Sequence, residues 1–310
     1  MIDHKITLFT SSSVSLNLIS YLLSKNILAC VVISSRMDSD ANLLLQTLIQ
    51  QNIPYFQFDE KENNKNLEIL KQIQSDVALV FSFPYKLSET VLECFNSNVF
   101  NIHASALPKY KGSQPLFWQL RNGERTSALT LFKMTQGFDS GDIIIQKDFN
   151  INEKDTVGIL TGILSQLVIV IVEDFLDLLE QHGTTLPASA QIGEESQAPK
   201  LEHKDIIIDW ENMTSNDIVN LARACNPIFG GAQTLRNNST ICILEATAVT
   251  LSNLGLDAGT ILHIGSPDGL IVATIDSSIR LDIVSVPDGF FSGLRFAKRF
   301  NVDAGEKFSS

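Results

Sequence analysis

Short apolar runs alternate with longer amphipathic segments over the first hundred residues of the chain. The short runs are rich in β-branched and aromatic residues, which favour strands, and the segments between them carry apolar residues three and four positions apart, as helices that cover a sheet do. The expected strands are Ile6–Phe9, Leu28–Ser34, Tyr55–Phe58, Val77–Phe81 and Val99–His103, and the expected helices are Val14–Lys25, Asn42–Gln51, Leu67–Gln74 and Leu87–Phe95. This alternation predicts an α/β domain with a doubly wound, mostly parallel sheet.

The pattern changes after residue 103. A loop at 106–115 leads into a short helix, two strands joined by a turn at Gln136–Gly141, and a long amphipathic segment. The expected elements are helix Leu116–Arg121, strand Ser127–Lys133, strand Asp142–Asp148 and helix Thr156–His182. We therefore expect the first domain to occupy residues 1–182.

Residues 183–204 differ in kind, because Gly, Thr, Pro, Ser, Ala, Gln and Glu dominate and no periodicity is left. This composition predicts an interdomain linker. Beyond it, an amphipathic helix is expected at Ser215–Cys225, followed by short runs separated by Gly, Asp, Ser and Pro. The expected strands are Thr240–Glu245, Gly259–His263, Leu270–Thr274 and Ile279–Val286. Residues 205–310 are therefore expected to form a second domain, a small β-barrel or sandwich.

The composition is that of a folded protein of two domains, with 310 residues, 44% of them hydrophobic and 19% charged. Thirty-five Asp and Glu against 23 Lys and Arg give a net charge of −12, which disfavours nucleic acid as a partner unless basic residues gather on one face. The first residues lack the pattern of a signal peptide, and the most apolar stretch, Val157–Val172, falls short of the ~20 residues that a membrane span needs. We expect a cytoplasmic protein with no membrane partner.

The four cysteines, Cys30, Cys94, Cys225 and Cys242, stand apart from one another. They form no CxxC pair, and no histidine lies at metal-ligand spacing from them. Free cysteines are among the residue types most often buried. We therefore expect buried thiols in a reducing compartment and no metal site.

In an open parallel sheet, ligands bind beyond the carboxyl ends of the strands, so the residues that follow each strand are the first candidates for a site. The residues after the first strand, Thr10–Val14, contain neither G-x-G-x-x-G nor the Walker A glycines. A nucleotide cofactor is therefore not expected. The serines at this position are interpreted as a helix cap and turn.

The fifth strand ends in Asn101 and His103, which lie two residues apart and therefore point to the same face. Downstream, Asp139 stands in a turn between Gly137 and Gly141, and glycines let the backbone approach a ligand closely. A polar pair at a strand end is often only a hydrogen-bonded structural feature. Together with the carboxylate, however, the pair suits acyl transfer without a covalent intermediate.

In that chemistry Asn101 would donate a hydrogen bond to the developing oxyanion. His103 would either take a proton from the nucleophile or, when protonated, stabilise the oxyanion. Asp139 would fix the charge and orientation of the imidazole.

Three stretches of the chain resemble the 10-formyltetrahydrofolate-dependent formyltransferases. They are Asn101–Gly112 (NIHASALPKYKG), Asn122–Glu124 (NGE) and Phe138–Ile144 (FDSGDII). This family includes methionyl-tRNA formyltransferase, glycinamide ribonucleotide transformylase, aminosugar formyltransferases and formyltetrahydrofolate hydrolases. Beyond the linker, residues 198–200, 208–210 and 223–227 are similar to the start of the C-terminal domain of the methionyl-tRNA enzymes, which is an OB-like barrel.

The resemblance implies a Rossmann-like formyltransferase domain followed by an OB-like barrel, with 10-formyltetrahydrofolate as the formyl donor and no metal. It implies that Asn101, His103 and Asp139 are the catalytic residues. It also implies a slot for the pterin ring between the exit of the fourth strand and the turn before Asp139. The implied lining residues are Phe83, Tyr85, Lys86, Leu87, Thr135, Gln136, Gly137 and Phe138.

Departures from the family pattern concern the amine that accepts the formyl group. The first strand exit reads Ser11-Ser12-Ser13 where the family usually has Gly, and residues 34–40 lack the basic insertion of the tRNA enzymes. Together with the net charge, these departures favour a small or carrier-bound amine. Methionyl-tRNA is the alternative acceptor, left open by the C-terminal domain but not favoured. A third hypothesis is a non-catalytic folate-binding or assembly protein, against which the intact trio counts.

The stretch from Asp288 to Phe300 is aromatic and locally basic. One interpretation is that its aromatic residues pack against the barrel, because large aromatic side chains dominate core energetics. The other is that it forms a lid or contacts the acceptor.

Overall fold

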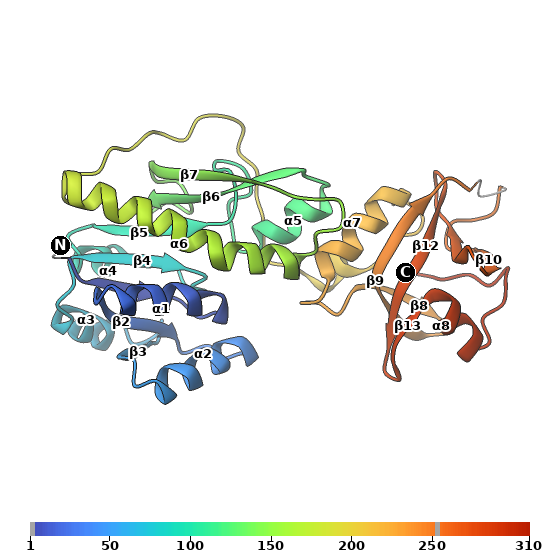
Figure 1. Cartoon of the computed structure of the whole chain (residues 1–310), viewed down its shortest axis with the longest axis horizontal. Helices are drawn as coiled ribbons and strands as arrows, with labels where there is room; N and C mark the ends of the chain where they lie inside the picture. Colours follow the sequence, from blue (N-terminus) through green and yellow to red (C-terminus); the bar gives the residue numbers. More distant parts are fainter. Residues whose placement is uncertain (1–3, 252–254) are drawn as a thin grey trace. The chain divides into compact units, whose positions relative to one another are not determined.

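A seven-stranded sheet organises the N-terminal part of the protein (Figure 1). The computed structural model describes residues 4–251 and 255–310. The strand order is β3-β2-β1-β4-β5-β6-β7, in which β1 to β5 are parallel and β6 and β7 are antiparallel to their neighbours. The strands are β1 Ile6–Phe9, β2 Leu28–Ser34, β3 Tyr55–Phe58, β4 Val77–Phe81, β5 Val99–His103, β6 Thr126–Lys133 and β7 Ile143–Asn150. This sheet confirms the predicted doubly wound fold class.

The helices of this part differ from the predicted ranges by a few residues at their ends. They are α1 Leu16–Ser24, α2 Ser39–Gln50, α3 Asn63–Gln72, α4 Glu89–Glu93, α5 Pro115–Arg121 and α6 Val157–His182. Helix α2 starts three residues earlier than predicted because the Asp38 carboxylate accepts a hydrogen bond from the Ala41 N–H at 2.8 Å. The interpretation of the first serines as a cap is confirmed, since the Ser12 hydroxyl accepts from the Val14 N–H at the start of a 3-10 turn.

Helix α6 is long and apolar enough to cross a membrane by length and composition. In the structure its apolar side chains recur every three or four residues and are buried, for example Leu164, Val168, Phe175 and Leu179. Phe175 packs against Phe100 of β5, with ring centroids 4.9 Å apart. Packing in a protein core therefore accounts for the apolar side chains on this face of the helix, whereas Ile159 and Val170 are exposed.

The chain forms two compact units that do not follow a single cut in the sequence. Unit 1 comprises residues 1–115, 126–150 and 161–199, and unit 2 comprises residues 116–125, 151–160 and 200–310. Within unit 2, the buried Arg223 of α7 (Ser215–Cys225) donates to the carbonyl oxygens of Asn152 and Asp155, at 3.1 and 2.8 Å. Residues 151–160 therefore belong to unit 2, although the resemblance placed the start of the second domain only at residue 198.

Unit 2 is built on an antiparallel sheet of order β10-β11-β12-β9-β8, with β13 paired to β12. The strands are β8 Ala232–Arg236, β9 Ser239–Val249, β10 Ile261–Gly265, β11 Gly269–Ala273, β12 Ser278–Val286 and β13 Gly289–Ser292, followed by helix α8 Gly293–Arg299. The last residues of the chain link the two edges of this sheet, because Ser309 pairs with Leu235 of β8 and Lys307 pairs with Thr260 beside β10. This closure gives the predicted small barrel-like domain.

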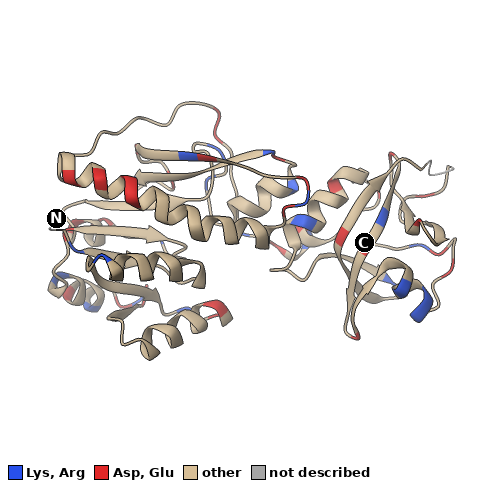
Figure 2. Ribbon diagram, viewed as in Figure 1, with Lys and Arg blue, Asp and Glu red and all other residues tan. Residues whose placement is uncertain are grey.

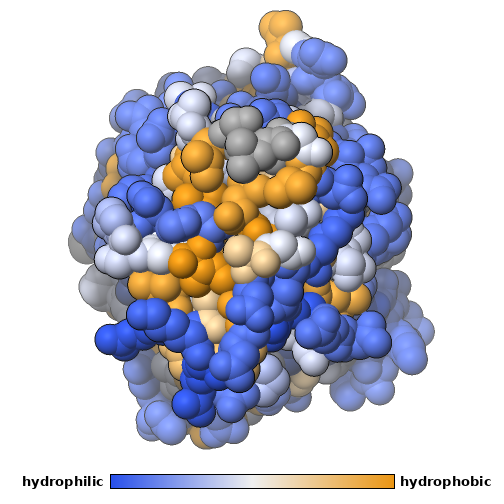
Figure 3. All heavy atoms as spheres, turned by 90° about the vertical axis from the view of Figure 1, so that its right-hand side faces the viewer, coloured by the Kyte–Doolittle hydropathy of each residue, from blue (hydrophilic) through white to orange (hydrophobic). Residues whose placement is uncertain are grey.

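The aromatic stretch at 288–300 does not fit one interpretation alone. Phe296 is buried and packs in unit 2, whereas the Phe290 side chain is 74% exposed. Figure 3 shows a further patch of apolar side chains, bordered by hydrophilic ones, on a face of unit 2. Exposed apolar residues of this unit include Leu251, Leu256 and Ile275.

The four cysteines are free, and burial separates them into two pairs. Cys30 and Cys225 are buried, and burial raises the pKa of the Cys30 thiol to about 11 and that of Cys225 to about 12. Because only the thiolate is alkylated, both should stay unmodified when the native protein is treated with iodoacetamide at pH 8. The half-buried Cys94 and Cys242 should be labelled first.

Mass spectrometry of peptides, with and without denaturant, measures the order in which the four cysteines are labelled. Labelling of Cys225 in the native protein as fast as labelling of Cys94 would contradict the burial that the structure gives it.

Candidate active site

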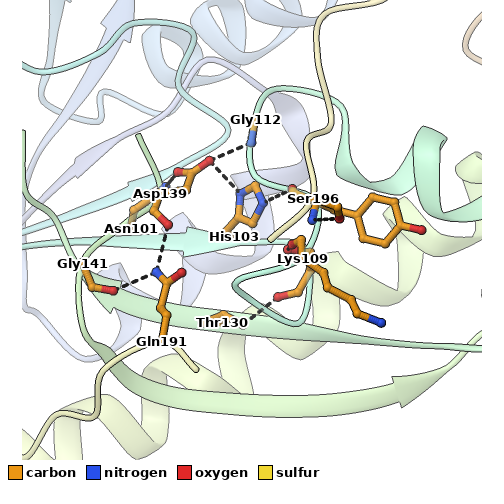
Figure 4. Close-up of polar contacts among 11 residues, drawn as sticks. Asn101, His103, Lys109, Gly112, Thr130, Asp139, Gly141, Gln191 and Ser196 are labelled. Carbon is orange, nitrogen blue, oxygen red and sulfur yellow. Dashed lines mark hydrogen bonds and ion pairs between the residues drawn. The ribbon is translucent and has the colours of Figure 1, made fainter. Parts of the chain in front are cut away.

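Two polar side chains project from the carboxyl end of β5 (Figure 4). Asn101 is half-buried and His103 is only 6% exposed. They lie at positions i and i+2 of one strand, which is why both reach the same side of the sheet. The third residue, Asp139, comes from the turn between β6 and β7.

The structure brings the three predicted residues together. The Asp139 carboxylate lies 3.5 Å from the Asn101 side-chain nitrogen and 3.8 Å from Nδ1 of His103. It also accepts a hydrogen bond of 2.8 Å from the backbone N–H of Gly112. An amide donor, an imidazole and a carboxylate therefore meet at one point, as acyl transfer requires.

The imidazole of His103 is held by the loop that follows β5. Its Nε2 lies 2.8 Å from the carbonyl oxygen of Tyr110. A carbonyl oxygen can only accept, so Nε2 carries the hydrogen and donates. Nδ1, which faces Asp139 at 3.8 Å, is then the nitrogen without a hydrogen in the neutral ring.

The two segments predicted to line the pterin slot contact each other at Lys86 and Phe138. The Lys86 ammonium lies 5.8 Å from the centre of the Phe138 ring, and that ring is 63% exposed. The Thr135 hydroxyl accepts from the Gly137 N–H at 3.3 Å, which shapes the turn that carries Phe138. Gln136 is exposed in the same turn.

The other predicted lining residues belong to the hydrophobic core of unit 1. Leu87 and Tyr85 are 2% and 7% exposed, and Phe83 packs edge-on against Phe9 with ring centroids 5.5 Å apart. The Tyr85 hydroxyl is hydrogen-bonded to Ser35, and the Arg36 guanidinium lies 4.8 Å from the Tyr85 ring centre. Among the predicted lining residues that follow β4, Lys86 is therefore the most exposed.

The exit of β1 already binds a carboxylate. The Ser12 hydroxyl donates to Asp40 at 2.6 Å, and the backbone N–H and hydroxyl of Ser13 donate to the same side chain. Asp40 lies in the first turn of α2, where negative charge is favourable. The donors that could have held a phosphate group at this exit are therefore used within the protein.

Residues 189–198, here called the strap, are part of this site although the sequence predicted them as linker. The Gln191 amide donates to the carbonyl oxygens of Asp139 and Gly141, at 2.8 and 2.9 Å (Figure 4). At the other end of the strap, the Ser196 hydroxyl accepts from the Tyr110 N–H at 2.9 Å. The one sequence signal for the strap was the family similarity that resumes at residues 198–200.

The strap also carries an ion pair. The buried Lys111 ammonium lies 2.7 Å from the Glu195 carboxylate, and the backbones of Lys111 and Ala198 are hydrogen-bonded. Within the described ranges 4–251 and 255–310, no group of three or more His, Cys, Asp and Glu side chains could hold a metal ion.

Residues 5–167 match the model of the formyl transferase family, and residues 200–292 match that of the formyl transferase C-terminal domain. The chain belongs to the formyltransferase family. This membership confirms the resemblance seen in the sequence and makes the protein an enzyme that transfers formyl groups.

Among curated relatives, the formyltransferase is 30% identical over 241 residues to methionyl-tRNA formyltransferase of Clostridioides difficile (strain 630), covering 77% of this chain and 76% of the relative. Among solved structures, it matches the sugar 3N-formyl transferase WlaRD with a TM-score of 0.65 and 23% identity, over 89% of this chain and 96% of that one. It also matches HypX from Aquifex aeolicus in complex with tetrahydrofolic acid, with a TM-score of 0.60 and 16% identity, over 98% of this chain and 48% of that one. These two structural matches support the fold.

Proposed function

We propose that the protein is an amine N-formyltransferase that uses 10-formyltetrahydrofolate as its donor. The observation that carries this proposal is the meeting of Asn101, His103 and Asp139 at the carboxyl end of β5 in a member of the formyltransferase family. That edge of a doubly wound sheet is where ligands bind.

The chemistry follows from the three side chains. A neutral primary amine attacks the formyl carbon, and a carbon–nitrogen bond forms while the carbonyl oxygen becomes an oxyanion. Asn101 donates a hydrogen bond to that oxygen. His103 takes the proton of the attacking amine or, when protonated, donates to the oxyanion, and Asp139 orients the imidazole. Collapse of the intermediate breaks the bond to N10, which takes up a proton, so that tetrahydrofolate and a formamide leave.

The residues beside the trio fit a folate. Phe138 offers an exposed aromatic face next to Asp139, and a flat pteridine ring stacks on such a face. Lys86 beside that ring supplies a positive charge for a carboxylate of the folate tail. This support is strongest for Lys86 and Phe138, because Tyr85 and Leu87 are buried.

For the acceptor, we propose a small or carrier-bound primary amine. The chain passes from β2 to α2 through residues 35–38, without room for a basic insertion. Asp40 occupies the donors of Ser12 and Ser13 at the exit of β1, so an acceptor's phosphate, if it has one, would bind elsewhere. The net charge of −12 supports the same choice.

Methionyl-tRNA is the second candidate. The curated relatives are named methionyl-tRNA formyltransferases, which speaks against disfavouring this acceptor. Unit 2 also has a shallow groove of about 640 Å³, lined by Phe290, Phe291, Ser292, Arg295, Lys298 and Arg299. Figure 2 shows basic residues on α8, whereas acidic residues line the C-terminal half of α6. Aromatic rings interleaved with cations are typical of surfaces that bind single-stranded nucleic acid.

An acceptor panel separates the two candidates. The purified enzyme is given 10-formyltetrahydrofolate with either charged initiator methionyl-tRNA or a dTDP-linked 3-amino sugar, and kcat/KM is measured from 50 to 200 mM salt. Three phosphate contacts give a log–log slope of about −2.7, so tRNA affinity should fall about 40-fold over this fourfold range. We expect efficient formylation of the small amine, with kcat/KM changing less than about twofold between 50 and 200 mM salt.

The triple variant Arg295→Ala, Lys298→Ala and Arg299→Ala provides the control, because it removes the cations of the groove. If tRNA is the acceptor, this variant should flatten the salt dependence. Efficient formylation of tRNA with a steep salt dependence would overturn the proposed small acceptor, and failure to use the folate donor with any amine would overturn the proposed function itself.

A further inference from the structure

The Gln191 side chain holds the backbone of the turn that carries Asp139. We propose that Gln191 is a positioning residue for formyl transfer: its amide fixes the backbone of this turn, so that the Asp139 carboxylate stays against His103 and Gly112. The inference rests on the proposed function, because it assigns Gln191 a role through Asp139.

Both hydrogens of the Gln191 amide are used. Its nitrogen lies 2.8 Å from the Asp139 carbonyl oxygen and 2.9 Å from the Gly141 carbonyl oxygen. Its oxygen is buried and has no hydrogen-bond partner in the described part of the chain. A flipped amide would place that oxygen against two carbonyl oxygens, so only one orientation of the side chain is compatible with the turn.

The turn needs an external support because its own backbone is strained. Asp139 has φ +44°, in the left-handed region that residues other than glycine rarely adopt. The turn is also tight, since a Cβ on Gly141 would lie 1.6 Å from the carbonyl oxygen of Lys133. No second donor to the carbonyl oxygens of Asp139 and Gly141 is found among the described residues.

The position of this backbone decides where the carboxylate lies. One carboxylate oxygen accepts from Gly112 N–H at 2.8 Å and lies 3.8 Å from Nδ1 of His103, and the other faces Asn101 at 3.5 Å. A rotation of the Asp139 backbone would break all three relations together. A misplacement of about 1 Å in an active site can lower the rate about 100-fold.

The strap holds the second partner of His103 in the same way. The Ser196 hydroxyl accepts from Tyr110 N–H, and the Tyr110 carbonyl accepts from Nε2 of His103. Both sides of the imidazole are therefore anchored to residues 189–198. Among these anchors, Gln191 is the side chain that bonds directly to the Asp139 turn.

The test compares Gln191→Ala and Gln191→Glu with Ile192→Ala. Ionised Glu has nearly the shape of Gln but no donor, and Ile192 is 88% exposed beside it in the strap. The variants are assayed with 10-formyltetrahydrofolate and methionyl-tRNA or the dTDP-linked 3-amino sugar, whichever the panel identifies. We expect both Gln191 variants to lower kcat about 10- to 100-fold with KM for the folate changed less than about threefold, and Ile192→Ala to match the wild type.

A double-mutant cycle tests whether the effect passes through Asp139. In an Asp139→Asn background, Gln191→Ala should lower kcat less than about threefold further, because the carboxylate it positions is gone. An unchanged kcat in both Gln191 variants, or a full additional loss in the Asp139→Asn background, would overturn the inference.

Hydrogen exchange of the Gly112 amide gives a readout that needs no acceptor. This N–H donates to the Asp139 carboxylate, so it should exchange about tenfold faster in Gln191→Ala than in the wild type or Ile192→Ala. If Asp139→Asn leaves kcat unchanged, the catalytic role in the proposed function fails, while faster Gly112 exchange would still support Gln191 as the support of the turn. Unchanged Gly112 exchange in a folded Gln191 variant would overturn the inference by itself.

Discussion

Replacing His103 by Ala should lower kcat for formyl transfer about 10²- to 10⁴-fold, which is the usual contribution of a positioned acid or base. In the proposed mechanism, Nδ1 of His103 is the nitrogen that exchanges a proton with the substrate, because Nε2 already donates to Tyr110. The affinity for 10-formyltetrahydrofolate should change less than about threefold, since the segments proposed to line the pterin slot do not include His103. Steady-state kinetics and equilibrium binding of the folate measure the two effects separately.

Stability must be followed in the same variant. His103 is buried, and its loss leaves the Tyr110 carbonyl without this donor, which costs about 1–3 kcal/mol of unfolding free energy. Chemical denaturation measures this cost. His182→Ala is the matched control, because His182 is exposed at the end of α6 and should tolerate the change in both assays. A folded His103→Ala enzyme with wild-type kcat would rule out the mechanism.

The parallel strands could be predicted from the sequence to the residue. Strands β1 to β5 have the predicted bounds. A strand inside such a sheet is mostly apolar, as β4 is at all five positions, whereas the edge strand β3 could be predicted from its aromatic residues. Helix starts were harder, since α2 begins at a capping carboxylate that precedes the periodic residues. The edge strand β8 was missed, because it is short and three of its five residues, Gln233, Thr234 and Arg236, are polar.

The contacts of the strap could not be predicted from hydrophobic patterns in the sequence. Gln191 bonds to carbonyl oxygens some 50 residues away in the sequence, and Ser196 to a residue 86 away. Such contacts leave no periodicity, because each side chain meets a different part of the fold. A segment without hydrophobic pattern was therefore predicted as linker although half of it braces the site.

The sequence predicted only part of the candidate site. Asn101 and His103 could be paired from strand periodicity alone, whereas Asp139 joins them through the antiparallel return of β6 and β7, which only the combined motif suggested. The folate contacts were named from resemblance as two segments. The structure separates their members into exposed ones, Lys86 and Phe138, and buried ones such as Leu87.

The Asn101 amide offers the second large effect. Asn101→Ala should lower kcat about 10²- to 10³-fold, because the loss of one donor to a developing oxyanion typically has this size. The effect on KM should be small, since the interaction strengthens only as the carbonyl oxygen gains charge. Asn98→Ala is the matched control: it removes an asparagine just before the same strand whose side chain makes no hydrogen bond in the described ranges. A raised KM with unchanged kcat in Asn101→Ala would instead make Asn101 a substrate-binding residue, and the oxyanion would then have to be stabilised by His103 alone.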